Sequence, residues 1–176
     1  VTALACFEHG ILTTENAHDR MRTLGYYRIG RNHKIDDTAP AGEYDFNRAF
    51  VKSSNSYFIE HGLHLGINNL LEYARRFHLG EKPGLRLNEE AAGIIPAIED
   101  VPAGGIPGKT ANLSIGQELT VTPVQLAMVI AAVANGGTVY WPRLIDRFEP
   151  GDPLSSEPAE HVRPAQVRTQ LPIQRE

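Results

Sequence analysis

The stretch Val51-Lys52-Ser53-Ser54-Asn55-Ser56-Tyr57-Phe58 decides how this chain is interpreted. Its polar centre, Ser53-Ser54-Asn55, follows an apolar i, i+3, i+4 pattern that is typical of a helix, and an apolar pattern resumes after it. Ser and Asn favour turns and helix N-termini because their short side chains bond nearby backbone amides. We therefore predict a helix, a polar elbow and a second helix. A plain helix cap at Ser54 or Ser56 would account for the same residues.

Composition places the chain among ordinary globular domains. Its 176 residues are 41% hydrophobic and 22% charged, which suits one domain with a real core. The net charge is −4 and no block of Lys or Arg occurs, which argues against nucleic-acid binding. The single cysteine, Cys6, allows no internal disulfide and leaves the compartment open. No apolar run approaches the length of a membrane span.

The chain before the elbow is predicted to hold one helix, one hairpin and a second helix. Residues 1–9 are apolar at helical spacing, and Gly10 is a natural C-terminal stop. The pattern already resembles the inside of a helix at the first residue, so we interpret the chain as a piece of a longer protein. Residues 26–29 and 33–36 flank a turn and predict a hairpin. Asp45 is the expected N-cap of the helix before the elbow.

After the elbow the sequence predicts three more helices, with an irregular stretch before the last of them. One helix runs from about Ser56 to Leu65, and Asn68 or Asn69 is expected to cap the next. Residues 81–108 are rich in Gly and Pro and predict an irregular connection. Thr122-Pro123-Val124-Gln125 has the form of a capping box and begins an Ala-rich helix that we expect to be buried.

The order of these landmarks resembles the transpeptidase domain of penicillin-binding proteins. The similarity covers residues 1 to about 147 and rests on these motifs in sequence: Glu8-His9-Gly10, Ser53-Ser54-Asn55, Leu65-Gly66-Ile67, Phe77-His78-Leu79-Gly80, Asn112-Leu113-Ser114-Ile115-Gly116-Gln117, Thr122-Pro123-Val124-Gln125-Leu126-Ala127 and Ala134-Asn135-Gly136-Gly137. The resemblance implies a mainly α fold: the helical subdomain of the penicillin-binding transpeptidase or serine β-lactamase-like fold, lacking most of its antiparallel sheet. Residues 1–147 would form the central part, and 148–176 a Pro-rich extended segment leading to a missing C-terminal part.

Of the family's three catalytic motifs, the resemblance places one in this chain. Ser53 and Asn55 match the Ser-x-Asn motif and are the expected catalytic residues, with no cofactor or metal. The Ser-x-x-Lys nucleophile would lie just upstream of Val1, and the Lys-Thr-Gly strand after Glu176. Ser53 would relay a proton to the departing amine, and Asn55 would orient the substrate amide. The chain alone is therefore expected to be inactive.

Three other features of the sequence could suggest a different site or depart from the family pattern. Lys109-Thr110 imitates Lys-Thr-Gly, but Ala follows it, and we interpret Lys109 as a surface loop residue. His61 and His64 have metal-ligand spacing without an obvious third ligand, which favours a solvated helix face. The family often has Gly after Ile-Gly-Gln, whereas this chain has Glu118, so the geometry of that loop stays open.

The resemblance implies a parent enzyme that cross-links peptidoglycan stem peptides through a serine acyl-enzyme and is trapped by β-lactam antibiotics. Its partners would be stem peptides, β-lactams and membrane proteins of cell-wall synthesis, with no nucleic acid. It would act in the periplasm, at the outer face of the inner membrane, anchored by a segment outside this chain. Two alternatives stay open: a non-catalytic binding module, and a β-lactamase-like hydrolase or sensor on the same fold.

Overall fold

The structure is a computed structural model that describes residues 1–31, 33–85, 89–99, 101–152, 158, 160–161 and 164–173. The chain divides into two compact units. The first comprises residues 1–75 and 94–120, and the second comprises residues 76–93 and 121–176. Within the described residues, no helix is both long and apolar enough to cross a membrane.

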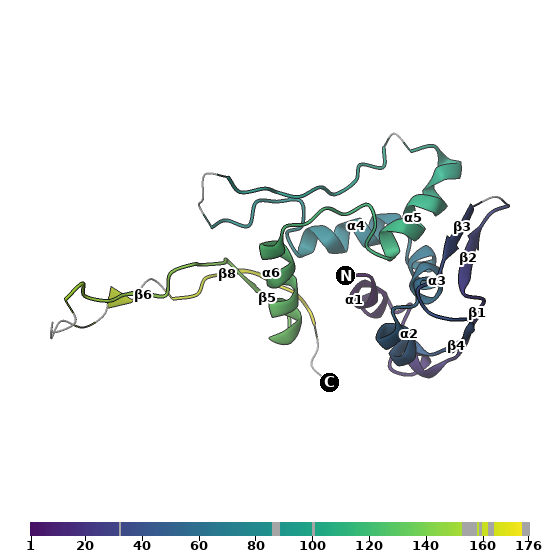
Figure 1. Ribbon diagram of the computed structural model, residues 1–176, viewed down its shortest axis with the longest axis horizontal. Helices are drawn as coiled ribbons and strands as arrows, with labels where there is room; N and C mark the ends of the chain where they lie inside the picture. Colours follow the sequence, from purple (N-terminus) through teal and green to yellow (C-terminus); the bar gives the residue numbers. More distant parts are fainter. Residues whose placement is uncertain are drawn as a thin grey trace. The chain divides into compact units, whose positions relative to one another are not determined.

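The first unit is built around a central helix. Its elements in chain order are α1 (Thr2–Glu8), η1 (Asn16–His18), β1 (Met21–Thr23), β2 (Tyr26–Ile29), β3 (His33–Asp36), β4 (Gly42–Tyr44), α2 (Phe46–Lys52), α3 (Asn55–Leu65), α4 (Ile67–Arg76), η2 (Ala103–Gly105) and α5 (Ile106–Ser114). The central helix α3 packs against α5, α1 and β2 (Figure 1). Its buried side chains Tyr57, Ile59 and Leu65 form the middle of the core.

Helix α3 approaches α5 closely because one of its residues has no side chain. A Cβ built on Gly62 would overlap the Ser114 hydroxyl and lie 2.6 Å from the Ser114 Cβ. The Ser114 hydroxyl in turn donates to the Thr110 carbonyl oxygen at 2.7 Å, which fixes its position. The Thr2 hydroxyl donates to the Ser114 carbonyl oxygen at 2.8 Å and ties α1 to the same point.

Two short antiparallel pairs flank α3. The predicted hairpin is confirmed, since β2 pairs with β3 from Tyr26 opposite Asp36 to Ile29 opposite His33. The pairing of β1 with β4, from Met21 opposite Tyr44 to Thr23 opposite Gly42, was not predicted. These strands have three residues each, too few for an alternating pattern to stand out in the sequence.

The helix boundaries confirm some sequence predictions and correct others. Asp45 caps α2 as predicted, its carboxylate accepting from the Arg48 amide at 2.8 Å. The expected cap at Asn68 or Asn69 is wrong, because α4 already begins at Ile67, directly after Gly66. The loop assignment of Lys109 is also wrong. It lies in α5, where Pro107 occupies the first turn, a position at which Pro favours a helix.

The second unit contains α6 (Pro123–Ala134) and four short strands: β5 (Thr138–Tyr140), β6 (Arg147–Phe148), β7 (Glu160–His161) and β8 (Val167–Gln170). The capping box is confirmed: the Thr122 hydroxyl accepts from the Gln125 amide at 3.2 Å, and the Thr122 amide donates to the Gln125 side chain at 2.7 Å. The side-chain amide of Gln125 also donates to two backbone carbonyl oxygens in the preceding loop, that of Glu81 at 2.9 Å and that of Ala92 at 2.8 Å.

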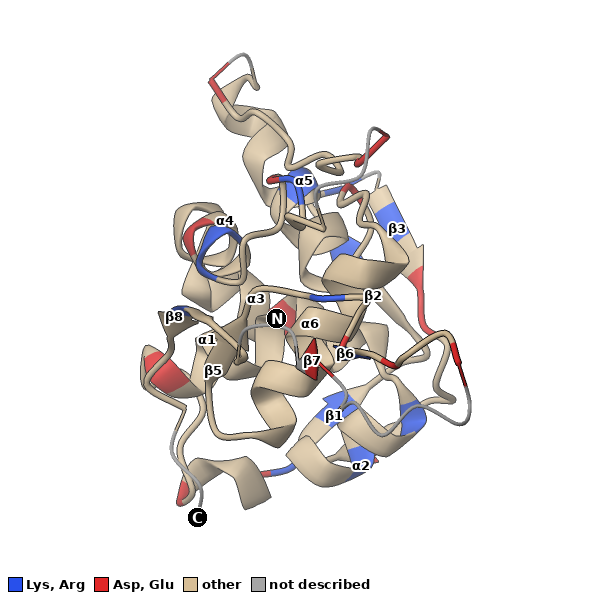
Figure 2. Ribbon diagram, turned by 90° about the vertical axis from the view of Figure 1, so that its left-hand side faces the viewer, with Lys and Arg blue, Asp and Glu red and all other residues tan. Residues whose placement is uncertain are grey.

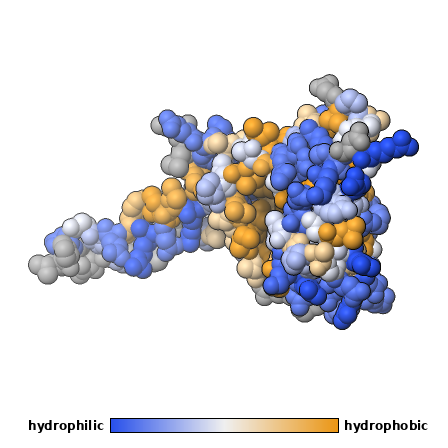
Figure 3. Space-filling model, turned by 45° about the vertical axis from the view of Figure 1, so that its right-hand side comes forward, coloured by the Kyte–Doolittle hydropathy of each residue, from blue (hydrophilic) through white to orange (hydrophobic). Residues whose placement is uncertain are grey.

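Two expectations for this unit differ from the structure. Helix α6 is not buried on most faces, because Leu126, Ile130 and Val133 are exposed. Figure 3 shows, on one face of the molecule, hydrophobic areas that interrupt the hydrophilic surface. Residues 148–176 were expected to form a Pro-rich extended segment outside the central part, yet β8 pairs with β5 and Leu171 beyond it is buried. The composition of residues 148–176 does not indicate this burial, which depends on pairing with a strand that is distant in the sequence.

The close contact between α3 and α5 gives a first prediction. Ala is favoured over Gly inside a helix by about 1 kcal/mol, but in Gly62→Ala the clash with Ser114 should outweigh this and destabilise the chain by about 1–3 kcal/mol. The control is Gly108→Ala in α5, where no atom lies within 4 Å of the new Cβ, and which should be neutral or stabilising. Denaturant unfolding measures both. A stabilised Gly62→Ala variant would contradict the contact.

Candidate functional site

The elbow is a sharp change of direction between α2 and α3. Ser53 ends α2 in the left-handed region, with φ 54° and ψ 48°. Ser54 begins α3 as its N-cap, its hydroxyl accepting from the Tyr57 amide at 3.4 Å. Ser54 is fully buried while Ser53 is exposed, so the two adjacent serines have different roles. Ser54 is therefore the plain helix cap that the sequence also allowed, and the neighbouring Ser53 remains exposed.

One carboxylate, that of Asp37, holds the elbow in place. One of its oxygens accepts from the Asn55 amide at 2.7 Å and the Ala39 amide at 3.0 Å. The other accepts from the Ser54 hydroxyl and the Ser56 amide, both at 2.9 Å. The N-terminal amides of a helix have no partner within the helix, so Asp37 supplies what α3 lacks. We call this arrangement the Asp37 clamp.

The residues beside Asp37 fix the two motif residues directly. The Asn55 side-chain amide donates to the Asp36 carbonyl oxygen at 3.0 Å. The Thr38 hydroxyl donates to the Ser53 carbonyl oxygen. The last residue of β3 thus orients the Asn55 carboxamide, and Thr38, two residues further on, holds the Ser53 backbone.

Hydrogen bonding decides the ionisation of Asp37. Burial of the half-buried carboxylate disfavours its charge. The hydrogen bonds from Ser56, Ala39 and Ser54 outweigh burial, so the pKa of Asp37 is lowered from its ordinary value of 3.8. A clamp with a lowered pKa stays ionised throughout the neutral range.

The elbow lies beside a cavity of about 420 Å³ in the first unit. Ser53, Ser54 and Asn55 line one side of it, and the start of α1, from Val1 to Ala3, lines another. The cavity is completed by Phe50, Phe58, Leu70, Leu113, Ser114, Ile115, Gly116 and Leu119. The structure therefore brings the two predicted site residues together along one opening, next to the N-terminal helix. We call it the elbow cavity.

The loop after α5 contains a residue in a strained conformation. Glu118, at the position where the family often has Gly, has φ 77°, which favours glycine. Its carboxylate lies 3.7 Å from the Lys109 ammonium and accepts from the Asn112 side chain at 3.4 Å. Lys109 thus belongs to a local ion pair on α5 and does not line the elbow cavity.

The two histidines of α3 are occupied by neighbouring groups. The His61 ring stacks on Tyr57 with centroids 4.2 Å apart, and its Nδ1 lies 2.8 Å from the Tyr57 carbonyl oxygen. Burial lowers the pKa of His61, which keeps it neutral at pH 7. His64 lies 3.5 Å from Glu60. Among the described residues, no cluster of three His, Cys, Asp or Glu side chains could hold a metal ion.

Comparison with known proteins identifies the family. The family model described as the penicillin-binding protein transpeptidase domain matches residues 1–174. The chain belongs to this transpeptidase family. It is 32% identical, over 69% of its length, to the peptidoglycan D,D-transpeptidase MrdA of Acinetobacter baumannii, and 29% identical, over 96% of its length, to the penicillin-binding protein PbpB of Mycobacterium tuberculosis.

Solved structures of transpeptidase family members share the fold. The chain superposes with a TM-score of 0.73 on Pseudomonas aeruginosa PBP2 in complex with WCK 5153, at 29% identity over 96% of this chain and 39% of that one. The TM-score is 0.70 with Mycobacterium tuberculosis PBP3 complexed with aztreonam, at 30% identity over 90% of this chain and 34% of that one. The chain spans only 19% of the MrdA relative and 23% of PbpB.

The Asp37 clamp predicts a pH-dependent contribution to stability. Asp37→Asn replaces one of the two acceptor oxygens by a donor and removes the charge that all four hydrogen bonds share, and should lower the free energy of unfolding by about 1–3 kcal/mol at pH 7. Because the pKa is lowered on folding, this contribution is complete above pH 3.8 and is lost as pH falls through the lowered pKa. Unfolding at several pH values should show the variant's deficit shrinking on acidification.

The control for the clamp is Asp36→Asn, which removes an exposed ion pair with Lys34 at 2.7 Å. Such a surface pair contributes about 0–1 kcal/mol. A deficit in Asp37→Asn no larger than in Asp36→Asn, or one that stays constant on acidification, would contradict the clamp.

The conformation of Glu118 predicts a stabilising substitution. A side chain in the left-handed region costs about 1–2 kcal/mol, whereas the partly buried pair with Lys109, with its charged atoms 3.7 Å apart, contributes about 1 kcal/mol or less. Glu118→Gly should therefore be more stable than the unsubstituted chain, and Glu118→Ala, which loses the pair but keeps the Cβ, less stable. Thermal unfolding gives the order, and a Glu118→Gly variant less stable than the unsubstituted chain would show that the ion pair outweighs the strain.

Proposed function

We propose that this chain is the elbow-bearing part of a peptidoglycan D,D-transpeptidase. The observation that supports this most is the elbow cavity, which Ser53 and Asn55 line together with the start of α1. The relatives add support, since they include peptidoglycan D,D-transpeptidases. The activity belongs to a longer protein in this proposal, because the nucleophilic serine and its lysine would precede Val1.

The proposed reaction has two steps. The nucleophilic serine attacks the carbonyl between two terminal D-Ala residues of a stem peptide, and the peptide bond breaks to give an acyl-enzyme and free D-Ala. The amine of a second stem peptide then attacks the ester and releases the serine, which forms the cross-link. A β-lactam acylates the same serine. Such an enzyme would act outside the cytoplasmic membrane, anchored by a segment beyond this chain, beside membrane proteins of cell-wall synthesis.

Ser53 and Asn55 have separate roles in the first step. The exposed Ser53 hydroxyl can both accept and donate a proton, so it would pass one to the leaving amine. Asn55 would accept from and donate to the substrate amide and so align its carbonyl. The Asp37 clamp supports both roles because it fixes the first turn of α3 and does not itself line the elbow cavity.

Acylation by a fluorescent penicillin tests the proposal in the whole protein that contains this chain. Ser53→Ala should slow acylation by about 10²–10⁴-fold, since it removes a proton relay. Asn55→Ala should slow it too, while Asn68→Ala, an exposed asparagine on α4, should leave the rate unchanged. The isolated 176-residue chain should not be labelled.

Each other outcome has a distinct meaning. If Ser53→Ala and Asn55→Ala are acylated as fast as the unsubstituted protein, neither residue takes part in the reaction. No labelling of the whole protein would favour a non-catalytic binding module. Rapid loss of the label by turnover would favour a β-lactamase-like hydrolase.

A further inference from the structure

Ser53 has a backbone conformation that is uncommon for residues other than glycine. It lies in the left-handed region directly after the last residue of α2. The Ser54 amide donates to the Ala49 carbonyl oxygen at 2.9 Å. The Ser53 amide donates to the Phe50 carbonyl oxygen at 3.2 Å. This pair of bonds is a Schellman motif, in which glycine is the usual residue at the position of Ser53. The chain therefore keeps a side chain where the backbone favours having none.

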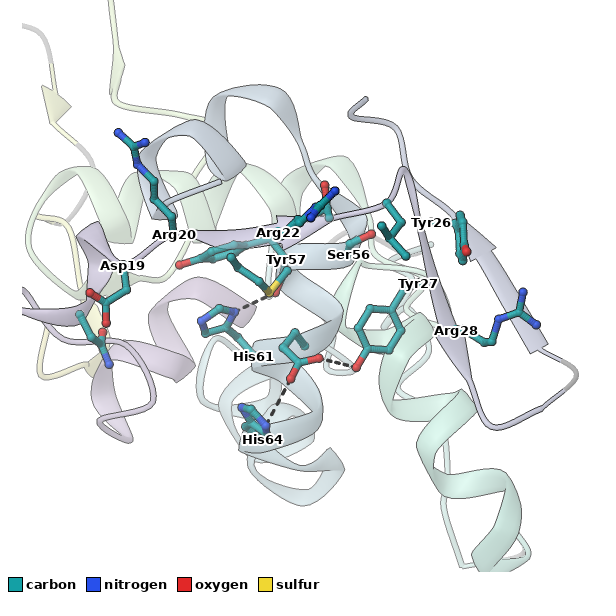
Figure 4. A pocket seen from close by; sticks show the side chains of 15 residues that line it. Asp19, Arg20, Arg22, Tyr26, Tyr27, Arg28, Ser56, Tyr57, His61 and His64 are labelled. Atoms are coloured by element: carbon teal, nitrogen blue, oxygen red, sulfur yellow. Dashed lines mark hydrogen bonds and ion pairs between the residues drawn. The ribbon is translucent and has the colours of Figure 1, made fainter. Parts of the chain in front are cut away.

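The three serines of the elbow have different surroundings. Ser54 is buried, and its hydroxyl donates to the Asp37 carboxylate at 2.9 Å. Ser56 is also buried and lines a second cavity, which β1 and β2 also line (Figure 4). Ser53 alone of the three is exposed, and it lines the elbow cavity. A strained backbone at an exposed residue beside a cavity is typical of a functional position.

The peptide group between Ser53 and Ser54 is held at both of its polar atoms. Its N–H, which belongs to Ser54, donates to the Ala49 carbonyl oxygen. Its carbonyl oxygen, which belongs to Ser53, accepts from the Thr38 hydroxyl. Because a peptide group is planar, the orientation of this plane determines the ψ angle of Ser53. That angle in turn sets the direction of the Ser53 side chain relative to α3, the helix that carries Asn55.

Thr38 is itself placed by its two neighbours in the chain. Asp37, before it, makes the four hydrogen bonds of the Asp37 clamp. Ala39, after it, is buried, and its amide is one of the four donors. Figure 2 shows acidic residues at the end of β3, where this segment leaves the strand. The backbone on both sides of Thr38 is therefore held, although Thr38 itself is exposed.

We propose that Thr38 is a positioning residue for the reaction: its hydroxyl holds Ser53 in the left-handed conformation and so fixes the Ser53 side chain relative to Asn55. This inference rests on the proposed function for the role of Ser53 as a proton relay. The assignment of Thr38 rests on its bond to the Ser53 carbonyl oxygen and on the conformation of Ser53. Without that bond, the peptide group is free to turn and relieve the strain, and the productive conformation is populated less.

Rates of acylation by a fluorescent penicillin, measured on the whole protein that contains this chain, test the role of Thr38. Thr38→Val keeps the shape of the side chain but removes the hydroxyl. It should slow acylation about three- to tenfold, the shift in a conformational equilibrium that one neutral hydrogen bond produces. Thr38→Ser keeps the hydroxyl, and its rate should lie within about twofold of the unsubstituted protein. Thr14→Val, the same change at an exposed threonine outside the elbow cavity, should leave the rate unchanged.

A double variant separates positioning from a general loss of stability. Thr38→Val should slow acylation little further when Ser53 is already alanine, because no hydroxyl is then left to position. An equal further slowing in the Ser53→Ala background would overturn the proposal, since Thr38 would then act by another route. A Thr38→Val variant acylated at the unsubstituted rate, or a Thr38→Ser variant as slow as Thr38→Val, would overturn it too.

The same measurements distinguish a failure of this inference from a failure of the proposed function. If the whole protein is not labelled, or if Ser53→Ala is acylated as fast as the unsubstituted protein, Ser53 is no proton relay and both proposals are wrong. If Ser53→Ala is slow while Thr38→Val keeps the unsubstituted rate, only the role of Thr38 is wrong.

Discussion

The structure of the first unit depends on four hydrogen bonds to one carboxylate. Asp37 accepts from the Asn55 and Ser56 amides, which begin α3, and from the Ser54 hydroxyl that caps it. Without such an acceptor the first turn of α3 would leave buried donors unpaired. With it, the turn is held at a fixed place although Ser53, one residue before the cap, has a left-handed backbone. The clamp converts a flexible sequence of small polar residues into a defined elbow.

The same turn separates two cavities with different chemistry. On one side, Ser53, Ser54 and Asn55 line the elbow cavity, which is otherwise mostly apolar. On the other side, Tyr57 and Glu60 line a second cavity of about 770 Å³, which β1 and β2 also line. Close packing of α3 on α5 at Gly62 leaves the helix little freedom to shift. A rigid helix with its N-terminal turn clamped is a suitable support for groups that must keep a constant separation.

The features that could be predicted from the sequence are those that depend on residues close together in the chain. Asp45 and Thr122 cap helices through amides three residues away, and both caps were recognised. The family assignment and the position of the elbow were also correct. The Asp37 clamp was missed because its bonds to α3 span 17 to 19 residues, and only the Asp37-Ala39 turn is visible locally. The exposure of Ile130 and the strand partner of β8 likewise depend on distant contacts, which a periodic pattern does not specify.

The most direct test is a crystal structure of the whole protein acylated by a penicillin. The central claim is that the Asp37 clamp directs the Ser53 hydroxyl and the Asn55 carboxamide to the group bound at the nucleophile. We predict both side chains within hydrogen-bond reach of the bound penicillin, about 2.7–3.2 Å, with the four bonds to Asp37 intact. A structure in which either side chain turns away from the bound penicillin while the clamp persists would contradict the account.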